Sequence, residues 1–539
     1  MWKIARLFSL NVLCFFTFLV IALGQTADGP RTATPIRHLV VIFPENISFD
    51  HYFGTYPHAA NPPGEPKFVG SRDTPAVNGL STALLTRNAN AANPENGQGA
   101  VNPFRLDRSQ AATADQDHDY TPEQMAFHAG LMDLFPKSVG KGNMPKGDPT
   151  SPLNTTGLTM GYFDGNTVTA LWNYAQHFSM SDNSFGSTFG PSTPGAINLV
   201  SGQTNGVVDI RNGRGGLADG GNGSYTLISD PDPVGDVCSA TTRMLVSMSG
   251  NNIGNLLSDA NVTWGWFMGG FDLTVKNANG TTGCKRSSKS PVSGKVMSDY
   301  IPHHEPFQYY PSTANPTHAR PSSVQSIGHS GDAANHQYDV HDFFDAVKAG
   351  NFPAVSFIKA PGFEDGHAGY SNPLDEQTFL VHMMNFLQSR PEWKDTAVVI
   401  AYDDSDGWYD HQMSPIVNQS SGSRDALVGP GSCGNGATAL PGVDPANAHA
   451  QGRCGFGPRL PMMAISPWAR VNYVDHSLTN QASVIVFIED NWLKGRRLGK
   501  GSFDGISNSI TGMFDFHGAP RTHKVFLNEK TGEVKTSGS

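Results

Sequence analysis

Short apolar runs alternate along this chain with segments in which apolar residues recur at helical spacing, and this alternation constrains the fold more than any other feature. The apolar runs lie at 35–43, 396–402 and 460–465, with weaker runs at 262–268 and 352–358. Helical spacing occurs in 167–178, 338–349, 375–388 and 482–494. Strands that alternate with helices predict an α/β protein with a largely parallel sheet, covered by helices on both faces.

One core domain with long insertions is the simplest organisation for the 539 residues. The chain has 59 Gly and 37 Pro but only 16% charged residues, which indicates many ordered loops rather than disorder. Loop-rich composition marks 57–103 as a long loop or lid, and 206–236 and 406–457 as further insertions. We therefore expect a single domain at 25–527 and a polar C-terminal tail at 528–539.

The first residues have the pattern of a signal peptide. Lys3 and Arg6 form a short basic region, an apolar stretch follows at 7–23, and Gly24 ends a motif of small residues. We expect cleavage of residues 1–24, and a mature protein that is secreted or periplasmic without stable membrane insertion. An uncleaved anchor is the alternative, because the apolar stretch approaches the length that spans a bilayer.

The charge of the chain argues against some partners. A net charge of −10 and a pI near 6.0 do not fit a general nucleic-acid binder, whose affinity depends on a basic surface. The same balance does not favour electrostatic attachment to anionic membranes.

Four cysteines remain when Cys14 of the leader is set aside. In an exported protein, four cysteines suggest two disulfides. Their spacing favours Cys238–Cys284 and Cys433–Cys454, each closing a Gly-rich loop, although three pairings are open. A zinc site is the rival interpretation, and the absence of any C-x-x-C pair weakens it.

Oxygen-bearing side chains follow two of the apolar runs directly. Glu45 and Asn46 follow the first run, and Asp403 and Asp404 follow the run at 396–402. In parallel sheets the carboxyl ends of strands form the ligand-binding edge, and carboxylate and amide oxygens suit a hard divalent cation. A helix N-cap at Asn46 and a solvated acidic turn at 403–404 are the ordinary alternatives. Two strands that end in oxygen ligands favour a metal site.

Ser192 is the candidate nucleophile. It follows Gly190 and Pro191, which favour a tight turn, and it could begin a helix whose N–H groups attract a phosphate. A hydroxyl nucleophile needs activation, which a nearby cation supplies. The alternative is a serine that only caps the helix, which is the commoner use of such a residue.

Histidines in predicted loops could hold phosphoryl oxygens or protonate a leaving alkoxide, chemistry that suits mildly acid pH. The candidates are His118, His303, His304 and His367. Each alone could equally be a surface or structural histidine. The remaining ones considered are interpreted as structural or supporting: His51, His177, His329, His382 and His411.

Six segments together resemble the bacterial phosphoesterase family of acid phosphatases and phosphatidylcholine-type phospholipases C, within the alkaline-phosphatase-like superfamily. They are ENISFDHYFGTYP, DQDHDY, FGPSTPGAINLVSG, HHEPFQYY, KAPGFEDGHAGYSNPLDEQ and VVIAYDDSDGWYDH. Their number and order make the likeness specific, and they are spread from about Ile36 to the strand near Pro467, nearly the whole mature chain.

The resemblance implies a three-layer α/β/α sandwich, alkaline-phosphatase-like, with the site at one edge of the sheet. In the acid phosphatase branch the cation is held by residues that match Glu45, Asn46, Ser192, Asp403 and Asp404. Residues that match His118, His303, His304 and His367 line the phosphate pocket.

Three departures place the chain nearer the acid phosphatase branch. The phospholipase branch usually has Arg where Ile47 stands and often Thr in place of Ser192. After the proline it tends to have Asn-Arg, where this chain has Gly195-Ala196. These departures leave lipid substrates open.

The predicted function is therefore an exported phosphoric ester hydrolase of the acid phosphatase type. It uses one divalent cation of unidentified metal, and Ser192 forms a phosphoserine intermediate with a phosphate ester substrate. A phospholipase C that cleaves phosphatidylcholine-type lipids is the first alternative. A phosphate- or glycan-binding protein without catalytic activity is the second.

Overall fold

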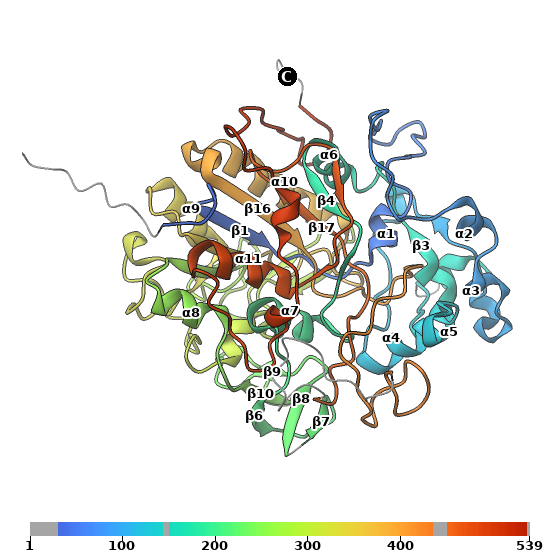
Figure 1. The fold of residues 1–539 in the computed structure, drawn as a ribbon, viewed down its shortest axis with the longest axis horizontal. Coiled ribbons are helices and arrows are strands. Elements are labelled where there is room, and N and C mark those ends of the chain that lie inside the picture. The colour runs from blue at the N-terminus through green and yellow to red at the C-terminus, as the bar shows by residue number, and fades with distance from the viewer. Residues whose placement is uncertain (1–30, 144–149, 222, 435–449, 536–539) are drawn as a thin grey trace, which may run out of the picture. The chain divides into compact units, whose positions relative to one another are not determined.

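Eight strands form the central sheet, in the order β14-β11-β15-β1-β16-β17-β4-β18 (Figure 1). The computed structural model describes residues 31–143, 150–221, 223–434 and 450–535. The strands of this sheet are β1 (His38–Ile42), β4 (Ser179–Ser181), β11 (Trp264–Met268), β14 (Gln337–Asp339), β15 (Val355–Lys359), β16 (Thr396–Ala401), β17 (Met462–Ile465) and β18 (Tyr473–Asp475). All five predicted apolar runs overlap a strand of this sheet.

The sheet is parallel apart from β17, which runs antiparallel to both of its neighbours. Strand β1 lies between β15 and β16, with Leu39 opposite Val355 on one side and Ala397 on the other. In Figure 1 the blue β1 and the orange β16 accordingly lie side by side, although they are far apart in the sequence. Strand β17 pairs with β16 in the opposite direction, and the described part of the connection between them, 402–434 and 450–461, contains no helix that crosses the sheet.

The main helices are α6 (Thr169–His177), α7 (Ser192–Ser201), α8 (Ile253–Asp259), α9 (Val340–Lys348), α10 (Pro373–Gln388) and α11 (Ala482–Trp492). Helices α6, α9, α10 and α11 occupy the four segments with helical spacing. Asn372 caps α10 through its side-chain oxygen, and Pro373 stands at the first helical position, where its missing N–H is no loss.

Helices cover both faces of the sheet, as alternate side chains of β11 show. The Trp264 ring packs against α8, where a β-carbon on Gly254 would lie 2.4 Å from it. The ring of Phe267 points to the opposite face and lies 5.3 Å from that of Phe343 in α9. Helices α7 and α11 continue the α8 side, while α10 and α6 continue the α9 side. The predicted three-layer α/β/α sandwich with a mostly parallel sheet is confirmed.

The predicted insertions contain short elements of their own. The short helices are α1 (Phe49–Phe53), α2 (Thr82–Thr86), α3 (Ala89–Ala92), α4 (Tyr120–Phe127) and α5 (Phe135–Ser138). The peripheral strands are β2 (Phe104–Arg105), β3 (Gly161–Tyr162), β5 (Ser184–Phe185), β6 (Val207–Arg211), β7 (Leu217–Gly221), β8 (Ser224–Leu227), β9 (Asp232–Pro233), β10 (Leu245–Met248), β12 (Ser287–Lys289), β13 (Val296–Ser298) and β19 (Thr479–Asn480). Thus 57–103 is not a featureless loop, because α2 and α3 fall within it.

Two disulfides join Cys238 to Cys284 and Cys433 to Cys454, the pairing that the spacing favours. The second disulfide holds the chain beside the turn that carries Ser192, since the Phe189 N–H donates to the Cys454 carbonyl at 3.0 Å.

The chain from Thr32 onward forms one compact unit. Within the predicted C-terminal tail, the Gly532 carbonyl accepts a hydrogen bond from Asn173 Nδ2 at 2.9 Å. The predicted signal peptide at 1–24 lies outside the described residues. In the part of the chain that the structure describes, no helix is both long enough and apolar enough to cross a bilayer.

Candidate active site

Polar side chains from three distant segments meet where the parallel strands of the sheet end. Glu45 and Asn46 follow β1, and Asp403 and Asp404 follow β16, which pairs with β1 up to Ile42 and Ile400. Ser192 is the first residue of α7. All five are almost completely buried. The structure therefore brings together the five residues predicted to hold a metal.

The Ser192 hydroxyl points at two of the carboxylates. Its Oγ donates to Glu45 Oε2 at 3.0 Å and lies 3.2 Å from Asp404 Oδ2 as an alternative acceptor. The turn before it contains Gly190 at φ +116°, a backbone conformation that favours glycine. The N-cap of α7 is Pro191, and the Ser192 hydroxyl points to the two carboxylates of the site.

Glu123 of α4 links the segments that carry Ser192 and Asp404. Its Oε2 accepts from the Gly190 N–H at 2.9 Å, and its Oε1 accepts from the Ser405 hydroxyl at 2.6 Å. Burial raises the pKa of Glu123 to about 8. Glu123 was not predicted from the sequence, because no feature of DQDHDYTPEQ distinguishes it from an ordinary acidic residue in the first turn of a helix.

Two buried oxygens beside Ser192 have no hydrogen-bond partner among the described residues: Asn46 Oδ1 and Asp403 Oδ2. Buried acceptors are rarely left unsatisfied in proteins. Asn46 has φ +51°, and its N–H lies 3.4 Å from Asp403 Oδ1, which holds both side chains at the site. Carboxylate and amide oxygens are the donors that hard divalent cations prefer, so these residues fit a metal ion.

Electrostatics also favour a cation here. Burial and the charge of Glu45 raise the pKa of Asp403 well above its ordinary value. Burial also raises the pKa of Asp404 to about 8, against the opposing charge of His118. Carboxylates this close repel each other unless a cation lies between them.

His304 and His303 approach the site from the loop after β13. His304 Nδ1 lies 3.1 Å from Glu45 Oε1, and burial lowers the pKa of His304 well below its ordinary value. His303 is further out: its ring nitrogen Nδ1 is 3.6 Å from Asp232 Oδ1. Its carbonyl accepts from the Thr193 hydroxyl at 3.2 Å, which places it beside the nucleophile turn.

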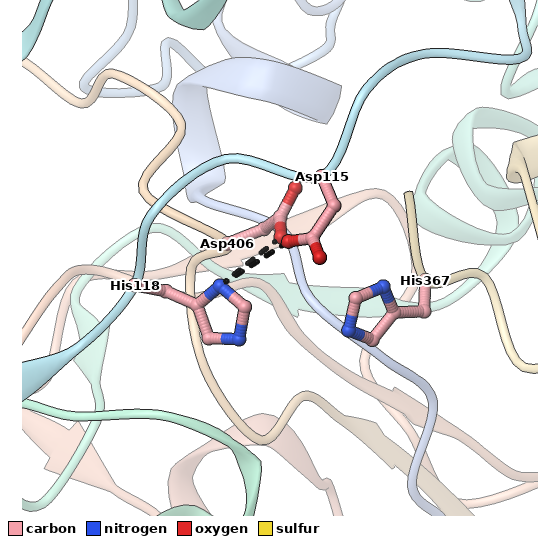
Figure 2. A group of neighbouring side chains, drawn as sticks. All are labelled: Asp115, His118, His367 and Asp406. Atoms are coloured by element: carbon pink, nitrogen blue, oxygen red, sulfur yellow. Dashed lines mark ion pairs between the residues drawn. The ribbon is translucent and has the colours of Figure 1, made fainter. Parts of the chain in front are cut away.

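His118 and His367 form the other side of the site, with Asp115 and Asp406 next to the His118 ring (Figure 2). His118 Nδ1 lies 3.3 Å from Asp406 Oδ1 and 3.7 Å from Asp115 Oδ1. The two histidine rings are 5.8 Å apart. Although burial disfavours the charged ring, the carboxylates of Asp404 and Asp406 raise the pKa of His118 well above its ordinary value.

This group of four could hold a metal by its residue types, but the contacts of His118 place a proton on Nδ1. This nitrogen is 3.0 Å from the Gln116 carbonyl, a contact that requires a proton there. It also faces both carboxylates, which favour the charged ring. Nε2 lies 3.4 Å from the donor Asn46 Nδ2 and accepts in this contact. A phosphoryl oxygen that replaced the Asn46 amide would instead bind a protonated Nε2.

Lys359 is a residue of the site that the sequence analysis did not assign. It is the last residue of β15, it is 1% exposed, and its ammonium forms an ion pair with Glu45. The rule that found Glu45 and Asp403 could have found it, because it is a charged residue at the end of an apolar run. Asp365 is also buried there, and its carbonyl accepts from the Glu45 N–H at 2.9 Å.

The phosphoesterase family model matches residues 36–493, which is most of the chain. The chain belongs to the phosphoesterase family. This confirms the resemblance that the six segments carry. Family membership supports the predicted reaction class, a phosphoric ester hydrolase, and both acid phosphatases and phospholipases C fall within that class.

Curated relatives of this phosphoesterase include bacterial phospholipases C. The chain is 23% identical to the non-hemolytic phospholipase C of Pseudomonas aeruginosa over 85% of its own length and 54% of the relative. It is 23% identical to phospholipase C B of Mycobacterium tuberculosis, over 93% of its own length and 81% of the relative. The chain thus spans about half of the Pseudomonas protein.

Solved structures that resemble the phosphoesterase include the murine ectonucleotide pyrophosphatase/phosphodiesterase 5, with a TM-score of 0.31 and 11% identity over 65% of this chain and 94% of that chain. A mutant alkaline phosphatase has a TM-score of 0.29 and 9% identity over 64% and 94%. TM-scores this low support no conclusion about function.

Proposed function

We propose that this phosphoesterase is a metal-dependent phosphoric ester hydrolase of the acid phosphatase type, with Ser192 as its nucleophile. The observation that carries the proposal is the Ser192 hydroxyl, 3.0 Å from Glu45 and 3.2 Å from Asp404, beside the unpartnered oxygens of Asn46 and Asp403. A buried hydroxyl with carboxylates for its proton is the arrangement that nucleophilic catalysis requires.

One divalent cation would be held by the five residues Glu45, Asn46, Ser192, Asp403 and Asp404. When bound, such a cation lowers the pKa of a coordinated hydroxyl and stabilises negative charge on phosphoryl oxygens. Oxygen donors leave Ca, Mg, Mn, Fe and Zn as candidates.

In the first step, Ser192 Oγ forms a bond to phosphorus while the ester P–O bond breaks. The Ser192 proton passes to the Glu45 or Asp404 carboxylate to which the hydroxyl already points. The departing alkoxide takes a proton from a histidine and leaves as the alcohol. In the second step, water attacks the phosphoserine and gives a proton to the histidine that protonated the alcohol. The Oγ–P bond breaks, and Ser192 Oγ takes its proton back from the carboxylate as inorganic phosphate leaves.

The histidines bind the phosphoryl group in this proposal. The Asp406 carboxylate beside Nδ1 favours a positive charge on His118, so this ring is suited to bind an equatorial oxygen in place of the Asn46 amide. His304 and His367 flank Glu45, whose charge acts on both rings. His303 lies at the outer side, beside Thr193, where a proton for the leaving group would be needed.

Gly195 favours the acid phosphatase branch over the phospholipase branch. A β-carbon at this position would lie 2.2 Å from the Asp403 carbonyl oxygen, so the first turn of α7 packs too closely on β16 for a larger residue. The phospholipase branch tends to have Asn at the corresponding position. Ile47, fully buried here, stands where that branch usually has Arg.

A phospholipase C is the second candidate, and the names of the curated relatives favour it. It would use the same core residues and differ in the alcohol that leaves. Hydrolysis of an aryl phosphate, an aryl phosphodiester and phosphatidylcholine micelles separates the two candidates: the proposal expects the monoester to have the highest kcat/KM. A non-catalytic binding protein would instead bind phosphate tightly and turn over none of them with any metal.

We also propose that the protein is exported, which the two disulfides support, since disulfides persist in oxidising compartments. Residues 25–527 would act as one phosphoesterase domain with insertions, followed by the tail at 528–539. The substrate would be a phosphate ester, either a soluble monoester or a phospholipid head group, and not a nucleic acid.

The nucleophile is tested by the Ser192→Ala variant with an aryl phosphate. The proposal expects a loss of about 10³-fold or more in kcat, because the covalent route is removed, while metal content stays unchanged. Ser201→Ala, a serine in the last turn of the same helix, is the matched control and should retain near wild-type turnover. Near wild-type turnover by Ser192→Ala with intact metal content would remove the assignment.

A further inference from the structure

Lys359 lies inside the site rather than at its rim. Its ammonium pairs with Glu45 Oε1 and is 3.9 Å from Asp403 Oδ2, and its side chain is 1% exposed. Lysine is rarely buried this completely unless it is paired. The position is set by the sheet, because β15 pairs with β1 in register and both strands end at the site.

The residues around the ammonium are a set that could bind a metal ion. Ligand atoms of Glu45, His304 and Asp365 lie within 4.8 Å of one another, and all three residues are buried. Asp365 is already oriented, because the His367 N–H donates to its Oδ1 at 3.0 Å and the Tyr370 hydroxyl donates to its Oδ2 at 3.0 Å. The charge of Lys359 acts on Asp365 as well as on Glu45 and Asp403.

Glu45 divides its two oxygens between two functions. Oε1 faces the Lys359 ammonium and His304 Nδ1, whereas Oε2 accepts from Ser192. Asn46 Oδ1 and Asp403 Oδ2 have no hydrogen-bond partner among the described residues, although Asp403 Oδ2 lies 3.9 Å from the ammonium. The ammonium thus already pairs with Glu45 Oε1, whereas Asn46 Oδ1 has no partner and Asp403 Oδ2 has only this more distant charge.

The buried charges around Lys359 are mainly negative. The carboxylates of Glu45, Asp365, Asp403 and Asp404 are all buried, and the ammonium offsets one of them. The His118 ring pairs with a further buried carboxylate, that of Asp406, at 3.3 Å. The ammonium therefore supplies positive charge that these carboxylates would otherwise need from a further cation.

We propose that the Lys359 ammonium takes the place of a second metal ion, at Glu45, His304 and Asp365, so that the site binds a single divalent cation. This inference rests on the proposed function, and it assigns to the lysine a task that the histidines could otherwise perform. Two-metal sites stabilise both the attacking and the leaving oxygen of a displacement. Here a fixed ammonium orients Glu45 toward Ser192 and adds positive charge, and it is not removed by a chelator.

The test is metal stoichiometry, measured by titrating the metal-free protein with Mn²⁺ or Zn²⁺ in a calorimeter. The wild-type protein should bind one equivalent. Lys359→Ala removes the ammonium and leaves space beside three ligands, so it should bind two. Lys359→Met keeps the length of the side chain without charge, fills the space and should bind one. Lys394→Ala, at an exposed lysine, is the control and should match the wild type.

Turnover provides a second readout. Without added amine or a second metal equivalent, Lys359→Ala should lose about 10²-fold or more in kcat, comparable to the removal of one charge-stabilising donor. Added methylammonium or ethylammonium should raise the kcat of Lys359→Ala at least about tenfold. It should not raise the kcat of Lys359→Met, because only the alanine variant leaves space for the amine. A lysine that merely stabilised the fold would not show rescue that depends on the space left.

Two results would overturn the inference: two equivalents bound by the wild-type protein, or one equivalent bound by Lys359→Ala together with no amine rescue. Failure of the proposed function is seen separately, through Ser192→Ala. If that variant keeps turnover, the nucleophile is wrong, whereas the stoichiometry of the Lys359 variants still reports on the ammonium. If Lys359→Ala does not fold, the wild-type stoichiometry and Lys359→Met decide.

Discussion

Gly195 packs against the main chain of Asp403 so closely that a β-carbon at position 195 would lie 2.2 Å from the Asp403 carbonyl oxygen. Contacts this short do not occur between real atoms, so any other residue at 195 must displace either α7 or the end of β16. The two elements carry Ser192 and the acidic pair Asp403–Asp404. The glycine therefore sets how near the nucleophile lies to its carboxylates.

The first prediction concerns this contact. Gly195→Ala should lower kcat for an aryl phosphate by about tenfold or more, because the first turn of α7 must move away from Asp404. It should also lower the free energy of unfolding by about 1–3 kcal/mol, as overpacked sites do. Gly215→Ala is the control, since a β-carbon there meets nothing within 4 Å. An unchanged kcat in Gly195→Ala would show that the contact relaxes without moving Ser192.

The second prediction concerns Glu123, which accepts hydrogen bonds from the Gly190 N–H and the Ser405 hydroxyl. Glu123→Gln turns one acceptor into a donor, so one of these groups faces another donor. We expect about tenfold lower kcat, with KM little changed. The free energy of unfolding should fall by about 1–3 kcal/mol. The control is Glu489→Gln, which replaces another buried carboxylate, on α11. It should lower the free energy of unfolding and leave kcat unchanged. Equal effects of the two variants on kcat would refute a positioning role.

The third prediction concerns the metal. A free metal concentration of a hundred times the metal's dissociation constant should raise the free energy of unfolding by about 2.7 kcal/mol. A chelator should abolish both this stabilisation and the activity. Asp403→Asn should abolish the metal-dependent shift. In the metal-free protein it should be no less stable than the wild type, since burial and the charge of Glu45 disfavour the ionised Asp403 carboxylate more than Lys359 favours it. Asp490→Asn, on an exposed part of α11, is the control. Thermal unfolding with and without metal measures all of these.

The fourth prediction concerns acid stability. Burial alone would raise the pKa of Asp339, but hydrogen bonds from His341 and from the Asp272 N–H, with the charge of Arg286, hold it at about 2. A carboxyl whose folded-state pKa is depressed stabilises the fold above its unfolded pKa and loses that contribution as the pH falls through the folded value. Its ordinary value is 3.8.

The free energy of unfolding of the wild type should therefore exceed that of Asp339→Asn by about 2 kcal/mol above about pH 4. This difference should disappear as the pH falls from about 4 to about 2. Urea unfolding across this range measures it. Asp345→Asn, at a largely exposed residue of the adjacent helix α9, should show no such window. A constant difference between wild type and Asp339→Asn over the whole range would contradict the assignment.

Much of the site could be predicted because its residues follow a rule of parallel sheets. Glu45 and Asp403 each follow a clear apolar run, and such runs end at a common edge when the strands are parallel. The direction of β17 could not be read in this way, since an apolar run does not encode whether its neighbours are parallel. Strand β4 was missed because two of its three residues are serines, Ser179 and Ser181.

The residues that support the site were harder to predict than those within it. Glu123 acts through hydrogen bonds to two segments far away in the sequence, and a sequence pattern does not record such contacts. Lys359 ends its strand like the acidic residues, but a lysine at the end of a run is ordinarily interpreted as solvent-exposed. Its burial depends on the neighbouring strands, which place three acidic side chains around it.

The most direct test of the account is to trap the phosphorylated enzyme. Wild-type protein, loaded with metal and turning over an aryl phosphate, is quenched in acid, digested and examined by mass spectrometry. The account predicts phosphate on Ser192, at a level that rises with substrate and is absent when the metal is removed. Phosphate on another residue, or full turnover with no phosphorylated peptide at any quench time, would contradict it.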